Sequence, residues 1–256
     1  MLAGDSSPII GYPDAVFLLD GSNDLFQFKE GPVGARGELV DPNITLRFAV
    51  NPGLATRAGP LYYENGGYTG TGEVESIGRL MTLLYDLGFH PTIKRSHDIT
   101  ANDLRTHNVI LLGGSAQNKA VKDFQGPGSF DYDYKPADWG GSIVNLHPSS
   151  GEPDIYRIER EPASHILTSD YAIVSCLPGI DSSHRIITLG GLDTTGTWGA
   201  TSYLTSSVGA EEMSRAFHND FRSPYFESIL RVVLKNGHEV FSMHAVAVHS
   251  KPTEAN

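Results

Sequence analysis

Two segments of the chain repeat one pattern, in which an apolar run ends at a pair of glycines. Residues 108–118 read NVILLGGSAQN and residues 185–197 read RIITLGGLDTTGT. An apolar run without polar alternation is typical of a strand buried on both faces, and the small polar residues after the glycines predict a turn into a helix. The two segments therefore predict parallel strands whose carboxyl ends carry glycine-rich corners.

Other segments supply the remaining elements of a layered fold. The clearest is a helix at residues 73–87, which follows Gly72, ends at Gly88 and has one apolar stripe: Val74, Ile77, Leu80, Met81, Leu84 and Leu87. Further helices are expected at residues 98–106, where Thr100 and Asp103 have capping-box spacing, and at 115–124, 197–205 and 210–218. Strands are expected at residues 15–20, 44–50, 90–95 and 171–177. This alternation predicts an α/β fold with a mainly parallel, Rossmann-like three-layer sheet.

Antiparallel additions to that sheet are also expected. Residues 143–146 and 155–159 flank a turn and predict an antiparallel pair, whereas the Gly-, Pro- and aromatic-rich residues 125–141 predict a surface excursion. Asn236-Gly237 between two alternating runs predicts a C-terminal hairpin. The expected organisation is an N-terminal arm with added strands or a small lobe (residues 1–60, loose through Pro13, with a loop at 31–42), an α/β domain (61–250) and a disordered tail (251–256).

Charge and composition exclude several functional classes. Nineteen basic residues against 30 acidic ones give a net charge of −11, a field that repels phosphate backbones, so no nucleic-acid partner is expected. No apolar run approaches the ~18 residues of a membrane span, and neither a membrane partner nor a location outside the cytoplasm is expected. The single Cys176 lies in an apolar run and is expected to be a core thiol. Ten scattered histidines without an H-E-x-x-H motif argue against a metal site, and the identity of any cofactor is left open.

The glycine corners are the candidate binding sites. At both corners, backbone N–H groups and hydroxyls at a helix start suit a polar or anionic ligand. The alternative at the first corner is a tight turn that needs glycine for packing, and the alternative at the second is a threonine-rich helix cap. The first corner lacks the complete P-loop and nucleophile-elbow motifs. The candidate ligand-binding residues are Gly113, Gly114, Ser115 and Asn118 at the first corner, and Gly191, Asp193, Thr194, Thr195, Gly196 and Thr197 at the second.

Two acidic groups are candidates for chemistry. Glu73 follows the glycine-rich turn at residues 68–72 and is a candidate catalytic carboxylate, although a first-turn glutamate also complements the helix dipole. Asp131 and Asp133 share one face of an extended segment and are a weaker candidate for a divalent ion than for a solvated loop.

Four segments in order resemble the C-terminal α/β domain of a poorly characterised bacterial family, in which winged-helix or repeat domains often precede it. The segments are YTGTGEV, VILLGGSAQN, SDYAIVSCLPG and ITLGGLDTTGTWGA. They are similar to the family pattern of a YTGxGE helix start, a GSxxN strand end, a DYA strand and a GxxTxGT turn. The resemblance implies an α/β domain over roughly residues 62–248 and implies no particular activity; no winged-helix segment precedes the domain in this chain.

Three hypotheses for function follow. The first is a non-catalytic module that senses a small polar or anionic molecule at the glycine-rich strand ends. The second is a nucleotide-directed N-glycosidase or transferase that uses Glu73. The third is a structural subunit, with a homo-oligomer or protein partner bound through the C-terminal hairpin. All three remain open on the sequence, as does whether the chain is part of a longer protein.

Overall fold

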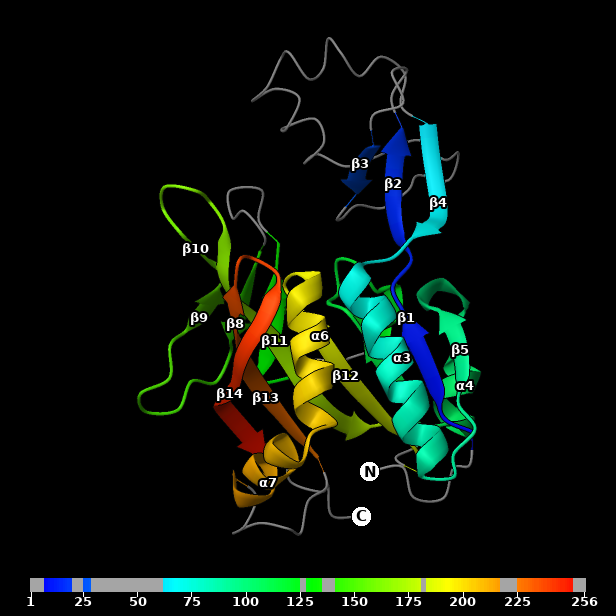
Figure 1. Ribbon diagram of the computed structural model, residues 1–256. Helices are drawn as coiled ribbons and strands as arrows, with labels where there is room; N and C mark the ends of the chain where they lie inside the picture. Colours follow the sequence, from blue (N-terminus) through cyan, green and yellow to red (C-terminus); the bar gives the residue numbers. More distant parts are fainter. Residues whose placement is uncertain are drawn as a thin grey trace.

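An eight-stranded mixed sheet organises the chain (Figure 1). The computed structural model describes residues 7–19, 25–28, 62–124, 128–134, 141–180, 183–216 and 225–250. The expected strand at 44–50, the loop at 31–42 and the tail at 251–256 lie outside these ranges. The strand order is β14 (Glu239–Ser250), β13 (Phe226–Lys235), β11 (Leu167–Pro178), β12 (Arg185–Gly191), β6 (Val109–Leu112), β1 (Ile9–Tyr12) and β5 (Thr92–Arg95), with β10 (Glu159–Arg160) paired to β11.

The sheet is parallel in one half and antiparallel in the other. Strands β12, β6, β1 and β5 run parallel, whereas β11, β13 and β14 pair antiparallel with their neighbours. The mixed α/β fold and the C-terminal hairpin are confirmed, but the sheet is not mainly parallel. The reason is chain length, because the short link between β11 and β12 has no room for the crossover that a parallel pair needs.

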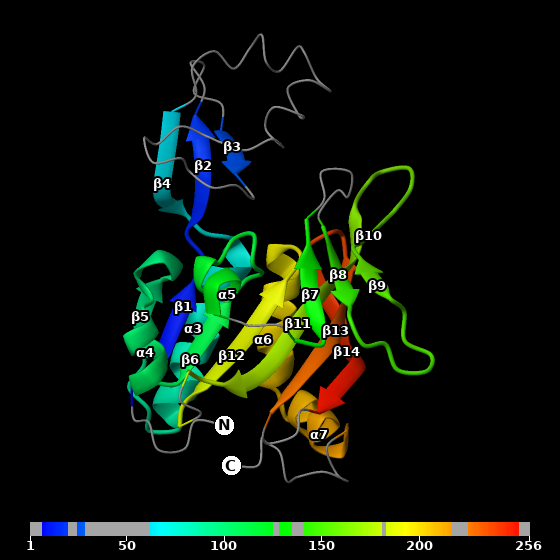
Figure 2. The same ribbon diagram turned by 180° about the vertical axis from the view of Figure 1, so that it is seen from behind.

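Helices cover both faces of the sheet. On one face α3 (Thr71–Asp86) lies beside α6 (Thr194–Leu204), with α7 (Ser207–Ala216) below α6 (Figure 1). On the opposite face lie α4 (Ala101–Thr106) and α5 (Lys119–Phe124), seen in Figure 2. The chain passes from β1 through α3 to β5, then back through α4 to β6 on the other side of β1. The order of strands therefore reverses between β1 and β6.

The expectation of a loose arm through Pro13 is wrong for β1. Ile9 and Ile10 are buried, and β1 pairs with β5 on one side and β6 on the other. Its four residues are too few for a periodic pattern, and Gly11 resembles a turn residue. After Asp14 the chain leaves the sheet for a three-stranded unit of β2 (Ala15–Leu19), β3 (Leu25–Phe28) and β4 (Tyr62–Tyr68). Figure 1 shows this unit above the carboxyl ends of the parallel strands.

A third sheet formed by β7 (Phe130–Asp133), β8 (Ser142–Asn145) and β9 (Ile155–Arg157) covers part of the back face (Figure 2). The predicted antiparallel pairing of the last two is confirmed. The surface excursion expected from 125 to 141 is wrong for β7, because Phe130 is 2% exposed and belongs to a core cluster. The aromatic residues at alternate positions of β7 pack into the core, although the glycines and prolines around them suggest a loop.

The predicted stripe of α3 is only partly correct. Leu80 and Leu84 are buried against the sheet, but Val74 and Leu87 are exposed. At its start α3 instead buries Gly72, Glu73 and Ser76, because this turn packs against α6. Apolar periodicity cannot reveal a buried face made of small and acidic residues. The expectation for Cys176 is confirmed: it is fully buried, and burial raises the pKa of its thiol to about 11.

Candidate functional site

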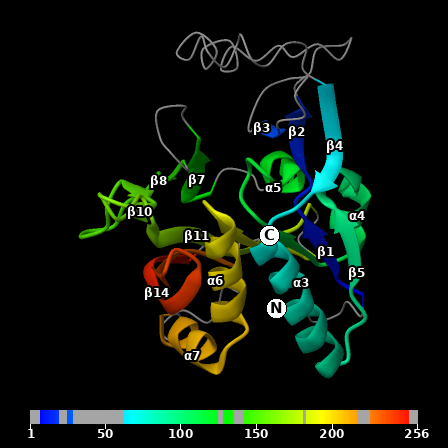
Figure 3. The same ribbon diagram turned by 45° about the horizontal axis from the view of Figure 1, so that its top comes forward.

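The two glycine corners lie next to each other at one rim of the sheet. Strands β6 and β12 are parallel neighbours, and the backbone N–H of Gly113 donates to the carbonyl of Leu189 at 3.0 Å. Helices α3 and α6 begin at the same rim, which Figure 3 shows tilted toward the viewer. The segments 70–73, 113–118 and 189–197 therefore meet at the carboxyl ends of β1, β6 and β12.

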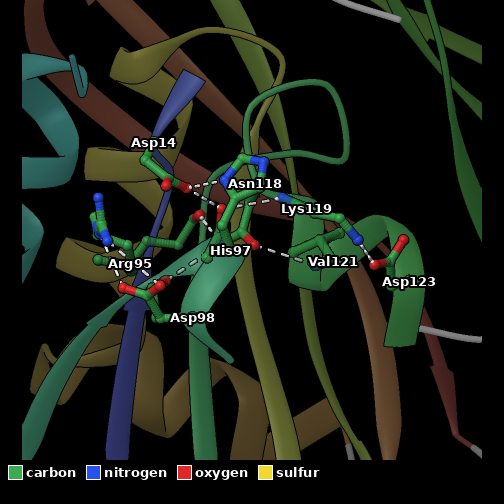
Figure 4. Close-up of polar contacts among 11 residues, drawn as sticks. Asp14, Arg95, His97, Asp98, Asn118, Lys119, Val121 and Asp123 are labelled. Carbon is green, nitrogen blue, oxygen red and sulfur yellow. Dashed lines mark hydrogen bonds and ion pairs between the residues drawn. The ribbon is translucent and has the colours of Figure 1, made fainter. Parts of the chain in front are cut away.

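The first corner is held by Asn118. Its side-chain amide is fully buried and donates to the carbonyls of Gly11 (3.2 Å) and Leu112 (2.7 Å), while its oxygen accepts from Val121 N–H at 3.2 Å (Figure 4). One side chain thus joins β1 to β6 and starts α5. Gly113 has φ +83, a conformation that favours glycine. Asn118 has a structural task here, whereas half-buried Ser115 makes no hydrogen bond within the described residues.

The second corner binds a carboxylate of the protein itself. Asp193 is the N-cap of α6 and accepts from Thr194 N–H at 2.7 Å. Behind it, Asp170 Oδ2 accepts from the N–H groups of Gly196 (2.7 Å) and Asp193 (3.1 Å) and from the Thr195 hydroxyl at 3.3 Å. Burial, followed by the charge of Asp193, raises the pKa of Asp170 to about 7. The donors expected to bind an anion at α6 are occupied.

Glu73 links the first turns of α3 and α6. It is 4% exposed, and its Oε2 accepts a short hydrogen bond from the Thr194 hydroxyl, which in turn accepts from Gly72 N–H at 2.8 Å. A methyl group at Gly72 would overlap the Thr194 carbonyl oxygen, so glycine is needed for this approach. Burial raises the pKa of Glu73 and the charge of Asp193 raises it further, against hydrogen bonds from Thr194 and Thr197. Glu73 is thus a buried carboxyl between the two corners.

Tyrosines from β7 and the loop after it close the back of both corners. Tyr132 donates its hydroxyl to the Gly190 carbonyl at 2.7 Å and stacks on Tyr134 at 5.9 Å between ring centroids. Methyl groups at Gly190 and Gly114 would overlap the hydroxyls of Tyr132 and Tyr134, respectively. These two glycines therefore have a packing role. The sequence shows the tyrosines only within an apparent loop.

A buried Asp–His pair lies beside the first corner. Asp14, 2% exposed, accepts from His97 Nδ1 at 2.8 Å and from the Ser96 hydroxyl by a short hydrogen bond (Figure 4). Ser96 and His97 begin the short 3₁₀ helix η1 (Ser96–Asp98) at the carboxyl end of β5. Sequence reasoning missed this pair, because its members follow different strands and form no local motif.

Some buried polar atoms around the rim have no protein partner among the described residues. They are the Thr69 hydroxyl, in the turn before α3, and Gln117 Oε1, in the loop after β6. Buried polar atoms are nearly always hydrogen-bonded, so each such atom marks a place for water or a ligand. Together with Ser115 they lie on the two loops that carry Glu73 and Gly113.

The predicted ligand-binding residues all lie at one rim, but their surroundings differ. Gly113, Gly114, Asn118, Gly191, Gly196 and Thr197 are buried, and Ser115, Asp193, Thr194 and Thr195 are half-buried. Thr197 already forms a hydrogen bond within the protein, because its hydroxyl accepts from Gly191 N–H at 3.1 Å. Asp131 and Asp133 lie apart on β7.

Within the described ranges no group of three or more His, Cys, Asp or Glu side chains is placed to hold a metal ion. None of the helices in those ranges has the length and apolar character to cross a membrane. Comparisons of the chain with protein-family models, with curated proteins and with solved structures find no match.

Proposed function

We propose that the parallel half of the sheet is a Rossmann-like unit and that the protein binds a small polar molecule at the carboxyl ends of β1, β6 and β12. Open α/β sheets bind ligands where the strand order reverses, which here is between β1 and β6. The observation that carries the proposal is a pair of buried polar atoms without a partner among the described residues, Thr69 Oγ1 and Gln117 Oε1, on the loops beside Glu73 and Gly113.

The chemistry of the rim suits a binding module. Glu73 and Asn118 are fixed by hydrogen bonds, so the site is organised before a ligand arrives. Preorganised side chains lose little conformational entropy on binding, which favours affinity. Ser115, Thr69 and Gln117 supply the groups that remain available for a ligand.

A thermal-shift screen with sugars, nucleosides, nucleotides, amino acids and carboxylic acids tests the proposal. A ligand at 100 times its dissociation constant adds about 2.7 kcal/mol to the free energy of unfolding, enough for a clear rise in melting temperature. We expect Glu73→Gln to fold but to lose the ligand-induced rise in melting temperature, because it replaces the carboxyl that lies between the two corners. Glu75→Gln is the control, since Glu75 lies in the same turn and is exposed. Loss of the response in both variants, or in neither, would contradict the assignment.

Hydrolysis of an N-glycosidic bond is the second candidate, favoured by the raised pKa of Glu73, which suits a proton donor to a leaving base. Incubation with nucleosides or a nicotinamide riboside, followed by chromatography, would show release of the free base. If the wild type releases base and Glu73→Gln does not, the catalytic function replaces simple binding. If ligands bind and remain intact, the module is not a glycosidase for those compounds.

A further inference from the structure

In its neutral form, His97 presents a hydrogen-bond acceptor at the same rim. Its Nδ1 lies 2.8 Å from the buried carboxylate of Asp14, which can only accept, so the proton of the neutral imidazole resides on Nδ1. The lone pair is then on Nε2, which points away from Asp14 (Figure 4). The His97 side chain is 30% exposed, and Nε2 has no partner within the ranges that the structure describes.

The pair is held firmly in this orientation. Asp14 also accepts from the Ser96 hydroxyl, and Ser96 Oγ accepts from Lys119 N–H at 3.2 Å. This chain of hydrogen bonds connects the end of β1, the helix η1 and the start of α5. The imidazole therefore keeps one tautomer and one direction.

The cations near His97 are already paired. Arg95 binds Asp98 at 2.9 Å, and Lys119 forms a short ion pair with Asp123 (Figure 4). On the other side of the rim, Asp170 occupies the N–H donors at the start of α6. A phosphate or carboxylate would thus meet acidic groups without a spare cation from these residues. Gln117 Oε1 is a further acceptor without a partner in the described chain.

We propose that the rim takes a neutral ligand with vicinal hydroxyl groups, a sugar ring that is either free or part of a nucleoside, and that His97 Nε2 accepts a hydrogen bond from one of those hydroxyls. This inference rests on the proposed binding function and specifies its ligand class. Acceptors at His97 and Gln117 match hydroxyl donors, whereas the acidic groups of the rim, beside cations that are already paired, disfavour anions. Asp14 is a positioning residue, since it acts only through His97.

Calorimetric titration with matched probes tests the ligand class. The probes are ribose, glucose, the four ribonucleosides, their 2′,3′-dideoxy analogues and their 5′-monophosphates. We expect a hydroxylated neutral probe to bind at least about tenfold more tightly than its dideoxy or phosphorylated counterpart, because a site built for a hydroxyl discriminates against its loss. Binding of ribose or glucose identifies a free sugar, and binding of nucleosides alone identifies the attached base as part of the ligand. Equal or tighter binding of the monophosphate would overturn the proposal.

Two substitutions separate the two nitrogens of His97. In His97→Asn the amide nitrogen still reaches Asp14, as Nδ1 does, but the acceptor at Nε2 is lost. We expect this variant to keep the melting temperature and to lose about tenfold in affinity for the best probe. His97→Gln leaves Asp14 with the Ser96 hydroxyl but without its imidazole donor, and is expected to melt earlier. Wild-type affinity in His97→Asn would overturn the role of Nε2.

A nitrogen-15 NMR spectrum provides a readout that a purely structural role would not change. We expect the His97 resonances to report the Nδ1–H tautomer, with a shift of Nε2 when the best probe is added. An unchanged Nε2 signal at saturation contradicts the proposal. If the broad screen instead yields an anion whose binding requires Glu73, the binding function stands and this inference fails. If no compound in either panel binds, both fail.

Discussion

Asp170 shows how a single buried carboxyl serves the site without contacting solvent. Its Oδ1 accepts from Tyr171 N–H at 2.7 Å, and its Oδ2 accepts from the Gly196 N–H in the first turn of α6. These N–H donors lower its pKa, but burial and the charge of Asp193 outweigh them, and the value rises to about 7. Near neutral pH this residue is therefore divided between its protonated and its charged form.

That shift predicts a pH-dependent stability. The pKa in the unfolded chain is about 3.9, so between that value and about 7 the folded protein binds the extra proton. The stabilisation is complete below the lower value and is lost as the pH rises through the upper one, up to about 4 kcal/mol for a three-unit shift. We expect Asp170→Asn to flatten this part of the stability profile, measured by urea unfolding from pH 5 to 8.

The same substitution has a cost that does not depend on pH. An amide cannot accept at both of its ends, so one of the N–H groups around residue 170 loses its acceptor, at about 1–3 kcal/mol. Asp131→Asn is the control, because Asp131 is exposed on β7. A profile of Asp170→Asn that retains the slope of the wild type between pH 5 and 7 would show that Asp170 is ionised throughout.

At this scale the sequence predicted part of the site. Glu73 and the corner residues could be identified because each lies in a local motif beside a helix start. The Asp14–Ser96 contact joins residues 82 positions apart, and no spacing within either segment indicates it. Such a pair becomes visible only when the order of strands is known, because that order decides which strand ends are neighbours.

At the scale of elements, glycine stabilises the C-terminal hairpin but weakens helix α3. Gly237 follows Asn236 at the hairpin turn, and both have positive φ, as a type I′ turn requires. Gly78 lies in the middle of α3, where a methyl group would meet no neighbouring atom within 4 Å. The first glycine is needed for its conformation, and the second only weakens its helix.

We therefore expect one substitution to change stability in opposite directions. Gly78→Ala should stabilise the protein by about 0.5–1 kcal/mol, the difference in helix propensity. Gly237→Ala should destabilise it by about 1 kcal/mol or more, because alanine is strained at positive φ. Chemical denaturation of the two variants and the wild type measures both effects. The same sign in both would refute the backbone argument.

Element prediction succeeded where a pattern was long or a turn was specific. The hairpin, the capping box of Thr100 with Asp103 and the pairing of β8 with β9 all depend on local signals. It failed for β1, which has four residues, and for the buried face of α3 near Glu73. In both places tertiary packing decided the structure, and a single segment contains little information about packing.

For the whole molecule, the edge at β14 bears on the hypothesis of a structural subunit. The register of β14 with β13 skips Phe241 and Val246, which form two bulges and are 75% and 39% exposed. Bulges interrupt the regular edge that a second strand would need. The edge is therefore poorly suited to strand addition, and the rim remains the better candidate for function.

The rim also couples the two halves of the sheet. Helix α3 belongs to the parallel half, and α6 follows β12 where the antiparallel half begins. Their contact through Glu73, Thr194 and Gly72 is one of the polar connections between them, and it is partly buried. The sequence could indicate each partner of this contact but not the contact itself, because Glu73 and Thr194 are separated by 121 positions.

A double-mutant cycle measures this coupling. We expect Glu73→Met, which removes the acceptor, and Thr194→Val, which removes the donor, to destabilise the protein singly and to show an interaction free energy of at least about 1 kcal/mol, as neighbours in one hydrogen-bond network do. The exposed pair Lys119 and Asp123, four residues apart on α5, is the control and should give no more than about 0.5 kcal/mol. Urea unfolding of the wild type and of the three variants in each cycle supplies the values. If the two substitutions at the rim are additive, the hydrogen bond between α3 and α6 contributes nothing, and the organisation of the rim must come from apolar packing alone.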